Sequence, residues 1–365
     1  MEYNELLKAN NINTLKILDI NGLLREPRTL VPSKNDGGDK SDMIFDLLMD
    51  STIRRGDGLV ASTVQNESKQ KIKEFVLKNE PINFVFQGFP FKCHNPIETL
   101  RKTPDLGELA FLQRLLDINE TVRQIYSPGV NFTVLSESET YKDLFGSTDY
   151  EIDKYKAGIQ TFLGKTGGNG TIRFIDFLDI LNNKSEFKMG CKHEEEYLFA
   201  SLTNPRISEE INKLVPVMSR SLPINQDVYY EDLLTVFGFN NRELTVFQKE
   251  FAEYIKSASV ELAVKYLAIA KMKKDNQIIK SVFPNYIYVS TIARNDTYSF
   301  HPIHKRTRIF PHHGVPVLGS DKVDIVYFGE IITHPEVYTA VYLEGDIEDA
   351  PFYFLKGKQH IKKQV

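Results

Sequence analysis

The sequence predicts an α/β fold in which helices flank a Rossmann-like sheet, with a mixed or antiparallel C-terminal part. Two short apolar runs, Ile82–Phe86 and Asn131–Leu135, enclose the amphipathic segment Leu106–Leu116. A strand, a helix and a strand in this order favour parallel pairing through a right-handed crossover. From Tyr286 on, β-branched and aromatic runs alternate with short turns, which is typical of strands.

Each element follows from a local pattern. Met43–Met49 and Lys69–Leu77 have helical apolar spacing, and Glu243–Lys274 is the longest pattern of this kind. The segment Gly164–Gly170 is rich in glycine, so we predict a flexible loop there. Three strands, some of them antiparallel, are predicted near the C-terminus: Tyr286–Ile292, Val323–Phe328 and Val337–Leu343.

These patterns divide the chain into three parts. Residues 1–40 are predicted to be a helical lead-in and a polar linker, with Leu6, Leu7, Leu15 and Leu18 at the apolar positions of the helix. Residues 41–285 form the α/β core with a helical insertion. Residues 286–365 form a strand-rich part that completes the site.

Composition narrows the class of protein. The chain has 365 residues, 41% of them hydrophobic, and a net charge of −4, which does not indicate a nucleic-acid binder. Its two cysteines, Cys93 and Cys191, lie far apart, as is typical of a reducing compartment. The N-terminus lacks the pattern of a signal peptide and no apolar run is long enough to span a membrane, so we expect a cytoplasmic enzyme.

The segment after the first predicted strand is the first candidate site. Ligands of open α/β sheets bind beyond the carboxyl ends of the strands. Asn95 and Pro96 suit the start of a helix, whose free N–H groups attract anions, and Lys92 precedes them. Lys92 is therefore a candidate phosphate or carboxylate ligand. The alternative is a solvated loop lysine beside an ordinary helix cap.

A second helix start follows at Thr103-Pro104-Asp105, with Thr103 as the cap. Asp105 and Glu108 are three residues apart and share one helix face. Paired carboxylates can hold an amine or act as a base. The commoner role of such residues is to complement the helix dipole, and both interpretations stay open here.

Three blocks of the chain follow one family pattern. They read Pro81-Ile82-Asn83-Phe84-Val85, then Phe89-Pro90-Phe91-Lys92-Cys93-His94-Asn95-Pro96, then Thr103-Pro104-Asp105-Leu106-Gly107-Glu108. On these blocks the chain resembles the pyoverdine/dityrosine biosynthesis family, whose bacterial members include the amino-acid isonitrile (isocyanide) synthases. Less specific blocks resemble the family in the same order: Tyr126-Ser127-Pro128-Gly129-Val130, Ser136-Glu137-Ser138, Met218-Ser219-Arg220, Pro311-His312-His313-Gly314 and Tyr353–Lys356.

The resemblance implies a reaction of secondary metabolism. Isonitrile synthases condense the amine of an aromatic amino acid, tyrosine first and tryptophan second, with the ketone of ribulose 5-phosphate. The sugar then fragments and leaves its carbonyl carbon on the nitrogen. The resemblance implies no cofactor and no metal, and it implies a non-haem iron oxygenase as a pathway partner. An N-formyl-tyrosine-forming enzyme and an inactive ligand-binding homologue are the alternatives.

Such chemistry needs cations for a phosphate and a carboxylate, an acid/base group and an apolar slot. His313, Lys92 and Glu108 are the candidate catalytic residues. Asp105 and Glu108 are candidates to receive the substrate ammonium. The candidate substrate-binding residues are Phe89, Phe91, Asn95, Asp105, Arg220, Ser290 and Arg294. Phe89 and Phe91 would line the slot, although core packing is the commoner role of such residues.

The chain departs from the family pattern near this site. Tyr288 and Ile292 stand where the family has an arginine and a histidine, and Arg294 or His301 could replace them. His312 stands where the family has a tryptophan. These departures motivate the inactive alternative.

Two other motifs do not predict a site. Gly158 and Gly164-Lys165-Thr166 have the wrong spacing for a phosphate-binding loop and follow a predicted helix. His193-Glu194 lacks the second histidine of a zinc-protease motif, and the histidines at 301, 304, 312 and 313 match no standard metal spacing.

Overall fold

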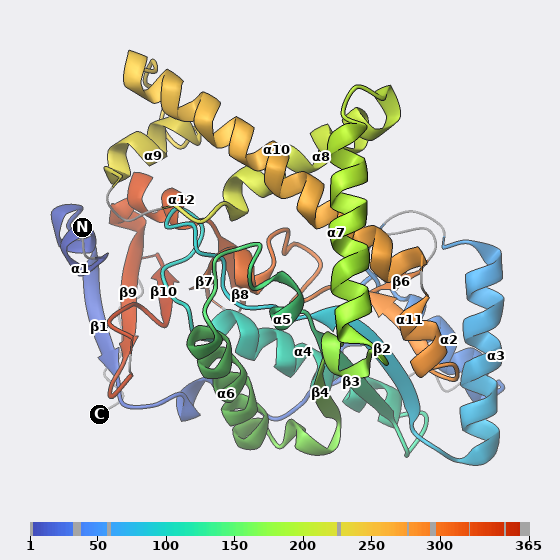
Figure 1. Ribbon diagram of the computed structural model, residues 1–365. Helices are drawn as coiled ribbons and strands as arrows, with labels where there is room; N and C mark the ends of the chain where they lie inside the picture. Colours follow the sequence, from blue (N-terminus) through green and yellow to red (C-terminus); the bar gives the residue numbers. More distant parts are fainter. Residues whose placement is uncertain are drawn as a thin grey trace.

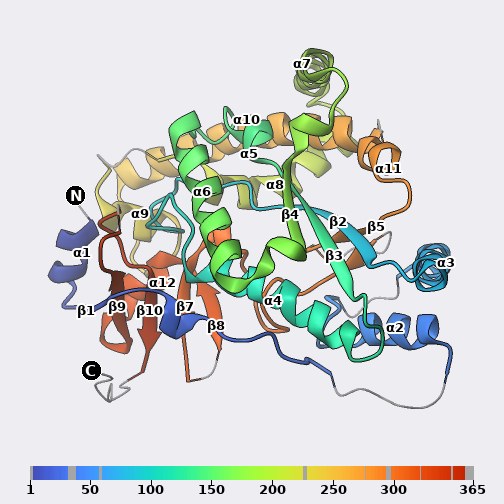
Figure 2. The ribbon, with the colours of Figure 1, turned by 90° about the horizontal axis from the view of Figure 1, so that it is seen from below.

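The computed structural model describes residues 3–31, 38–56, 60–224, 228–275, 277–292, 297–320, 322–346 and 348–357. Its centre consists of two five-stranded sheets, which lie side by side in Figures 1 and 2. One sheet is parallel throughout and has the order β4-β3-β2-β5-β6; the other is mixed and has the order β1-β9-β10-β7-β8. The predicted α/β class with a mixed C-terminal part is therefore confirmed.

The parallel sheet contains three of the strands that the sequence predicted, including both strands of the predicted crossover. Strand β2 spans Ile82–Gly88 and pairs with β3, Val130–Ser136, over its full length. The remaining strands are β4 (Ile172–Asp176), β5 (Ile287–Ser290) and β6 (Tyr298–Ser299). Because β3 and β4 extend the sheet on one side of β2 and β5 on the other, the strand order reverses beside β2, where ligands of such sheets bind.

Helix α4, Leu106–Arg123, connects β2 to β3 and packs against strands of both sheets. Most of its side chains are buried, and these include the polar side chains of Gln113, Arg114 and Asp117. Helix α6, Asp149–Thr166, packs against α4. Helix α6 continues through Gly164 and is capped by Gly167, whose φ of +68° suits glycine. The prediction of a loop over Gly164–Gly170 is therefore wrong for its first three residues, which are helical.

The mixed sheet includes three strands that the sequence did not predict, at Asn13–Ile17, Val315–Leu318 and Tyr353–Lys356. Its members are β1 (Asn13–Ile17), β7 (Val315–Leu318), β8 (Val323–Val326), β9 (Tyr338–Leu343) and β10 (Tyr353–Lys356). Strand β1 pairs in parallel with β9, so the helix expected around Leu15 is wrong. Leu15 and Ile17 face the core at a spacing of two, and their partner strand lies more than 300 residues away.

The other helices surround the sheets. Helix α10 is the longest, Val246–Asp275, and packs on α7, Lys184–Ala200, and α8, Pro205–Ser221. Figure 2 shows α10 running along one side of both sheets. The shorter helices are α1 (Tyr3–Ala9), α2 (Lys40–Met49), α3 (Ser62–Lys78), α5 (Ser138–Tyr141), α9 (Tyr230–Val236), α11 (Ile278–Val282) and α12 (Phe328–Thr333). Among the described residues, no helix combines the length and apolar character that a membrane crossing requires.

Candidate active site

The chain turns sharply where β2 ends. Phe89 is buried and has a φ of +52°, a conformation that is costly for a residue with a side chain and recurs at functional sites. The loop that follows contacts the short 3-10 helix Pro311–His313, which lies far along the chain. The Cys93 N–H donates to the His312 carbonyl oxygen at 2.9 Å. The Phe-Pro-Phe-Lys loop and the Pro-His-His segment therefore form one structural unit.

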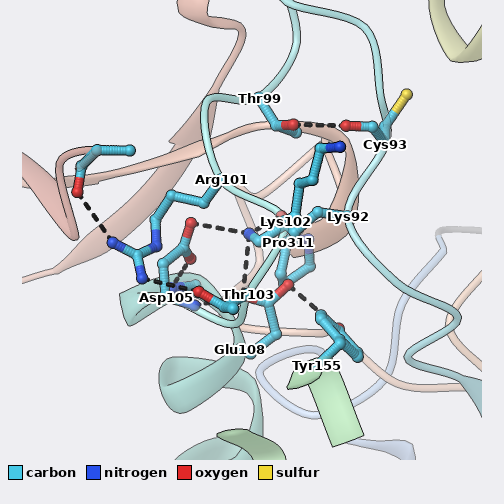
Figure 3. Close-up of polar contacts among 12 residues, drawn as sticks. Lys92, Cys93, Thr99, Arg101, Lys102, Thr103, Asp105, Glu108, Tyr155 and Pro311 are labelled. Carbon is cyan, nitrogen blue, oxygen red and sulfur yellow. Dashed lines mark hydrogen bonds and ion pairs between the residues drawn. The ribbon is translucent and has the colours of Figure 1, made fainter. Parts of the chain in front are cut away.

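Lys92 lies inside this unit, with a side chain that is 0% exposed. Its Nζ lies 2.8 Å from Asp105 Oδ2, 2.9 Å from Glu108 Oε2 and 2.7 Å from the Pro311 carbonyl oxygen. Figure 3 draws the residues of this cluster. A lysine ammonium has three N–H donors, so each donor already has an acceptor. This geometry argues against the predicted anion-binding role of Lys92 and favours a structural one.

The carboxylates of this cluster also serve helix α4. Asp105 is the N-cap, and its side chain accepts from the Gly107 N–H at 2.8 Å, while Glu108 accepts from the Asp105 N–H at 3.0 Å. Burial raises the pKa of Asp105 well above its usual range, and Lys92 opposes that shift. The arrangement favours the capping interpretation of Asp105 and Glu108. It also corrects the predicted cap at Thr103, whose hydroxyl pairs with Arg101 and Glu348.

Asn95 does not start a helix. Its Oδ1 accepts from the Ile97 N–H at 3.1 Å and its Nδ2 donates to the Ser219 carbonyl oxygen at 3.5 Å, and the residues after it form only a turn. The predicted helix start is therefore wrong, because the local pattern of a cap followed by proline also suits a turn. The fully buried Asn95 joins the loop to the end of α8.

The turn after Asn95 carries Glu98, which pairs with His313. His313 Nδ1 lies 3.0 Å from Glu98 Oε2, and the side chains are 26% and 3% exposed. A carboxylate at one ring nitrogen fixes the tautomer and leaves the other nitrogen for a substrate. His313 was among the candidate residues of the sequence, whereas Glu98, which lies between two of the family-like blocks, was not.

Cys93 lies beside this pair. One ligand atom from each of Cys93, Glu98 and His313 lies within 4.8 Å of the others. Burial raises the pKa of the Cys93 thiol well above its usual range, and the carboxylate of Glu98 acts in the same direction. The thiol is therefore held in its protonated form, and its Sγ lies 3.6 Å from the Arg220 carbonyl oxygen.

Arg220 and Tyr327 border the same place. The guanidinium of Arg220 donates to the Tyr327 hydroxyl at 2.8 Å and lies 4.6 Å from the centre of its ring. Burial raises the pKa of Tyr327, Arg220 opposes the shift, and Glu98 adds to it. A half-buried guanidinium beside a histidine–carboxylate pair is suited to bind a phosphate or carboxylate. Tyr327 was not predicted from the sequence.

A cavity of about 180 Å³ lies at the carboxyl ends of β3 and β4. Its lining includes Phe89, Tyr155 and Phe174, and the ion pair of Lys156 and Asp176, with 3.3 Å between Nζ and Oδ2, lies at its polar side. Tyr155 also donates to Glu108 at 3.3 Å, so the cavity wall contacts the buried Lys92 cluster. Phe91, by contrast, packs in the core against Phe145.

One predicted residue, Ser290, lies outside this arrangement. The Ser290 hydroxyl, at the end of β5, accepts from the Ile292 N–H at 3.0 Å. Arg294 lies outside the described residues, so the structure does not place it. Tyr288 lies on β5 and contacts Gln87 of β2 through its hydroxyl, at 3.3 Å. The structure thus brings together Cys93, Asn95, Glu98, Arg220, His313 and Tyr327.

Fold and site define an α/β protein whose polar centre lies where the strand order of a parallel sheet reverses. The family model of the pyoverdine/dityrosine biosynthesis proteins matches residues 72–328. The chain belongs to this family. The match includes the loop after β2, Arg220 and Tyr327.

Named relatives are similar over shorter stretches. The chain is 35% identical over 104 residues to the L-tryptophan isonitrile synthase AmbI1 of Fischerella ambigua, which covers 28% of this chain and 33% of that protein. It is 31% identical over 97 residues to an L-tyrosine isonitrile synthase of Pseudomonas aeruginosa. This match covers 27% of this chain and 30% of that protein. Each match thus spans about a third of the relative's length.

The crystal structure of the PvcA protein from Pseudomonas aeruginosa has a similar fold. It superposes with a TM-score of 0.65 at 16% identity and covers 86% of this chain and 99% of that chain. At this identity the likeness concerns the fold.

Proposed function

We propose that the protein is an isonitrile synthase, which joins the amine of an aromatic amino acid to a carbon of ribulose 5-phosphate. The observation that carries the proposal is the Glu98–His313 pair, which Arg220 and Tyr327 border through Cys93 and Glu98, in a chain whose family includes relatives named as isonitrile synthases for tryptophan and tyrosine. Tyrosine is the first candidate substrate and tryptophan the second.

The pair suits the proton transfers of this reaction. The amine must lose a proton as it adds to the sugar ketone, and the carbinolamine must gain one as water leaves. Glu98 holds His313 through Nδ1, so the second ring nitrogen of His313 is available for both transfers. Because the His313 side chain is 26% exposed, the ring is accessible to a substrate, unlike the buried Lys92.

Two further features supply the remaining requirements. Arg220 presents a fixed guanidinium to the phosphate of the sugar or the carboxylate of the amino acid. The cavity beside Phe89 and Phe174 offers an aromatic slot at the carboxyl ends of the strands. Under this proposal Lys92, Asp105 and Glu108 support the site from the interior and do not contact the substrate.

The test is the mass of the product. Purified protein is incubated with tyrosine or tryptophan and with ribulose 5-phosphate, and the mixture is analysed by liquid chromatography and mass spectrometry. We expect the isonitrile of one amino acid. A product heavier by one water would identify a formamide and support the N-formylating alternative. If neither amino acid is consumed, the proposal fails.

A further inference from the structure

The Cys93–Glu98–His313 cluster has a property that acid/base chemistry does not use. A thiol, a carboxylate and an imidazole, which are the three side-chain types that bind zinc in proteins, meet within 4.8 Å of one another. Cys93 and Glu98 are largely buried and His313 is partly exposed. We infer that these three residues form a binding site for one zinc ion, although the family resemblance implies no metal.

Hydrogen bonds to the backbone hold Cys93 and the segment before His313 in place. Cys93 is fixed through its N–H, which donates to the His312 carbonyl oxygen, and through its own carbonyl, which accepts from the Thr99 hydroxyl at 2.7 Å. Lys92 donates to the carbonyl of Pro311, two residues before His313. A site that is fixed before the ion arrives pays little ordering entropy on binding.

The distances allow a zinc ion with small adjustments. Zinc bonds of ~2.0–2.3 Å at a tetrahedral centre place ligand atoms roughly 3.3–3.8 Å apart. Nδ1 of His313 and Oε2 of Glu98 are 3.0 Å apart, so this distance must increase slightly. The widest separation between ligand atoms in the cluster lies within 4.8 Å and must decrease by at most about 1 Å. Water reaches the exposed side of His313 and can complete the coordination.

The charges favour zinc at this buried position. On binding, the Cys93 thiol gives its proton to solvent and its sulfur forms the bond to zinc. The Nδ1 proton of His313 moves through solvent to Nε2, which leaves Nδ1 free to bond to the ion, so binding releases one proton in total for each ion. The thiolate, the Glu98 carboxylate and a neutral imidazole then balance the two positive charges of the ion. A neutral complex avoids the cost of a buried uncompensated charge. A thiolate and an imidazole also select zinc over magnesium or calcium, which prefer oxygen ligands.

Zinc binding at this site does not depend on the proposed reaction, but it would affect that reaction. A zinc ion would occupy Nδ1 of His313 and the carboxylate of Glu98, which are the atoms that orient the acid/base pair. Zinc and the condensation step therefore compete for the same atoms, and zinc should act as an inhibitor that a chelator reverses.

The test uses cobalt(II) as a coloured substitute for zinc, because cobalt bonded to a thiolate absorbs strongly in the near ultraviolet. The chain supplies a matched control, since its second cysteine, Cys191, lies on α7 outside the cluster. We expect wild-type protein and Cys191→Ser to bind one cobalt ion with this band, and one equivalent of zinc to abolish it. Cys93→Ser should lack the band. A band that is absent from wild type, or that depends on Cys191, overturns the inference.

Two further variants keep the test decisive if Cys93→Ser does not fold, which far-ultraviolet circular dichroism will show. Glu98→Gln and His313→Ala retain the thiol and should weaken zinc binding at least ~10-fold, measured by competition with a chromogenic chelator. Unchanged zinc affinity in both variants would contradict the site.

Discussion

The Lys92 cluster and the Glu98–His313 pair come from the same two chain segments, yet they differ in burial. Lys92, Asp105 and Glu108 are almost fully enclosed, and each donor of the lysine has a partner. His313 keeps about a quarter of its side chain exposed and has one carboxylate partner. A charge with all its partners inside the protein can hold segments together, whereas a titratable ring that water reaches can exchange protons with a substrate. Burial therefore separates the supporting group from the reacting group.

The largest expected effect concerns the buried cluster. Lys92→Met should lower the free energy of unfolding by about 3–5 kcal/mol, because it leaves two carboxylates buried without their cation. Urea unfolding measures this loss. Lys213→Met, which breaks the exposed pair with Glu209, is the control and should change the same quantity by about 0–1 kcal/mol. Equal effects of the two substitutions would mean that the Lys92 cluster does not support the fold.

Glu98 should act on catalysis through the position of His313. Glu98→Gln is expected to lower kcat by roughly 10²-fold while the KM values change by less than about threefold, since the substrates still bind. Steady-state kinetics at fixed pH separates the two constants. Glu336→Gln, at an exposed position, should leave both unchanged. A rise in KM without a fall in kcat would contradict a positioning role.

His301 is a second histidine to compare with His313. It is buried, and no carboxylate is among the strongest influences on its pKa. Burial lowers its pKa from 6.5 to about 4, and the cations of Arg114 and Arg55 add to this shift. The unfolded chain therefore binds a proton below pH 6.5 that the folded chain does not, so stability falls as the pH decreases through this range.

Wild type should lose about 1–2 kcal/mol more stability than His301→Gln between about pH 7 and about pH 5. Urea unfolding at several pH values measures the difference. Parallel losses in the two proteins would show that His301 is not held neutral.

The smallest expected effect concerns anion binding. Arg220→Lys should raise the KM for ribulose 5-phosphate by roughly 5–10-fold, because a lysine cannot reproduce the planar contact with the Tyr327 ring or a two-point contact with phosphate. The KM for the amino acid should stay the same. If the amino-acid KM rises instead, Arg220 binds the carboxylate of the amino acid.

Local patterns were sufficient for the elements whose stability is local. The crossover β2–α4–β3 was predicted because apolar runs and helical spacing lie within one short segment. Strand β1 was missed because its pairing with β9 depends on residues at the opposite end of the chain. Lys92 was predicted to bind an anionic ligand because its position in the sequence matches an anion-binding site. Only the folded chain shows that the start of α4 brings two carboxylates to its side chain.

In the candidate site, too, the sequence identified single residues but not their partners. His313 was identified from its motif, but its partner Glu98 lies 215 residues earlier, and no spacing rule connects the two. The contact of Arg220 with Tyr327 likewise joins positions 107 residues apart. Motifs thus supplied the residue types, while tertiary structure decided which of them meet.

The central claim is that the Glu98–His313 pair carries out the condensation. The most direct test supplies chelator-treated wild type and His313→Gln with tyrosine or tryptophan and with ribulose 5-phosphate carrying carbon-13 at its carbonyl carbon. Mass spectrometry then follows the labelled product. We predict a labelled isonitrile from wild type and at least a ~10²-fold lower rate from folded His313→Gln. A labelled isonitrile formed at equal rates by both proteins would contradict the claim.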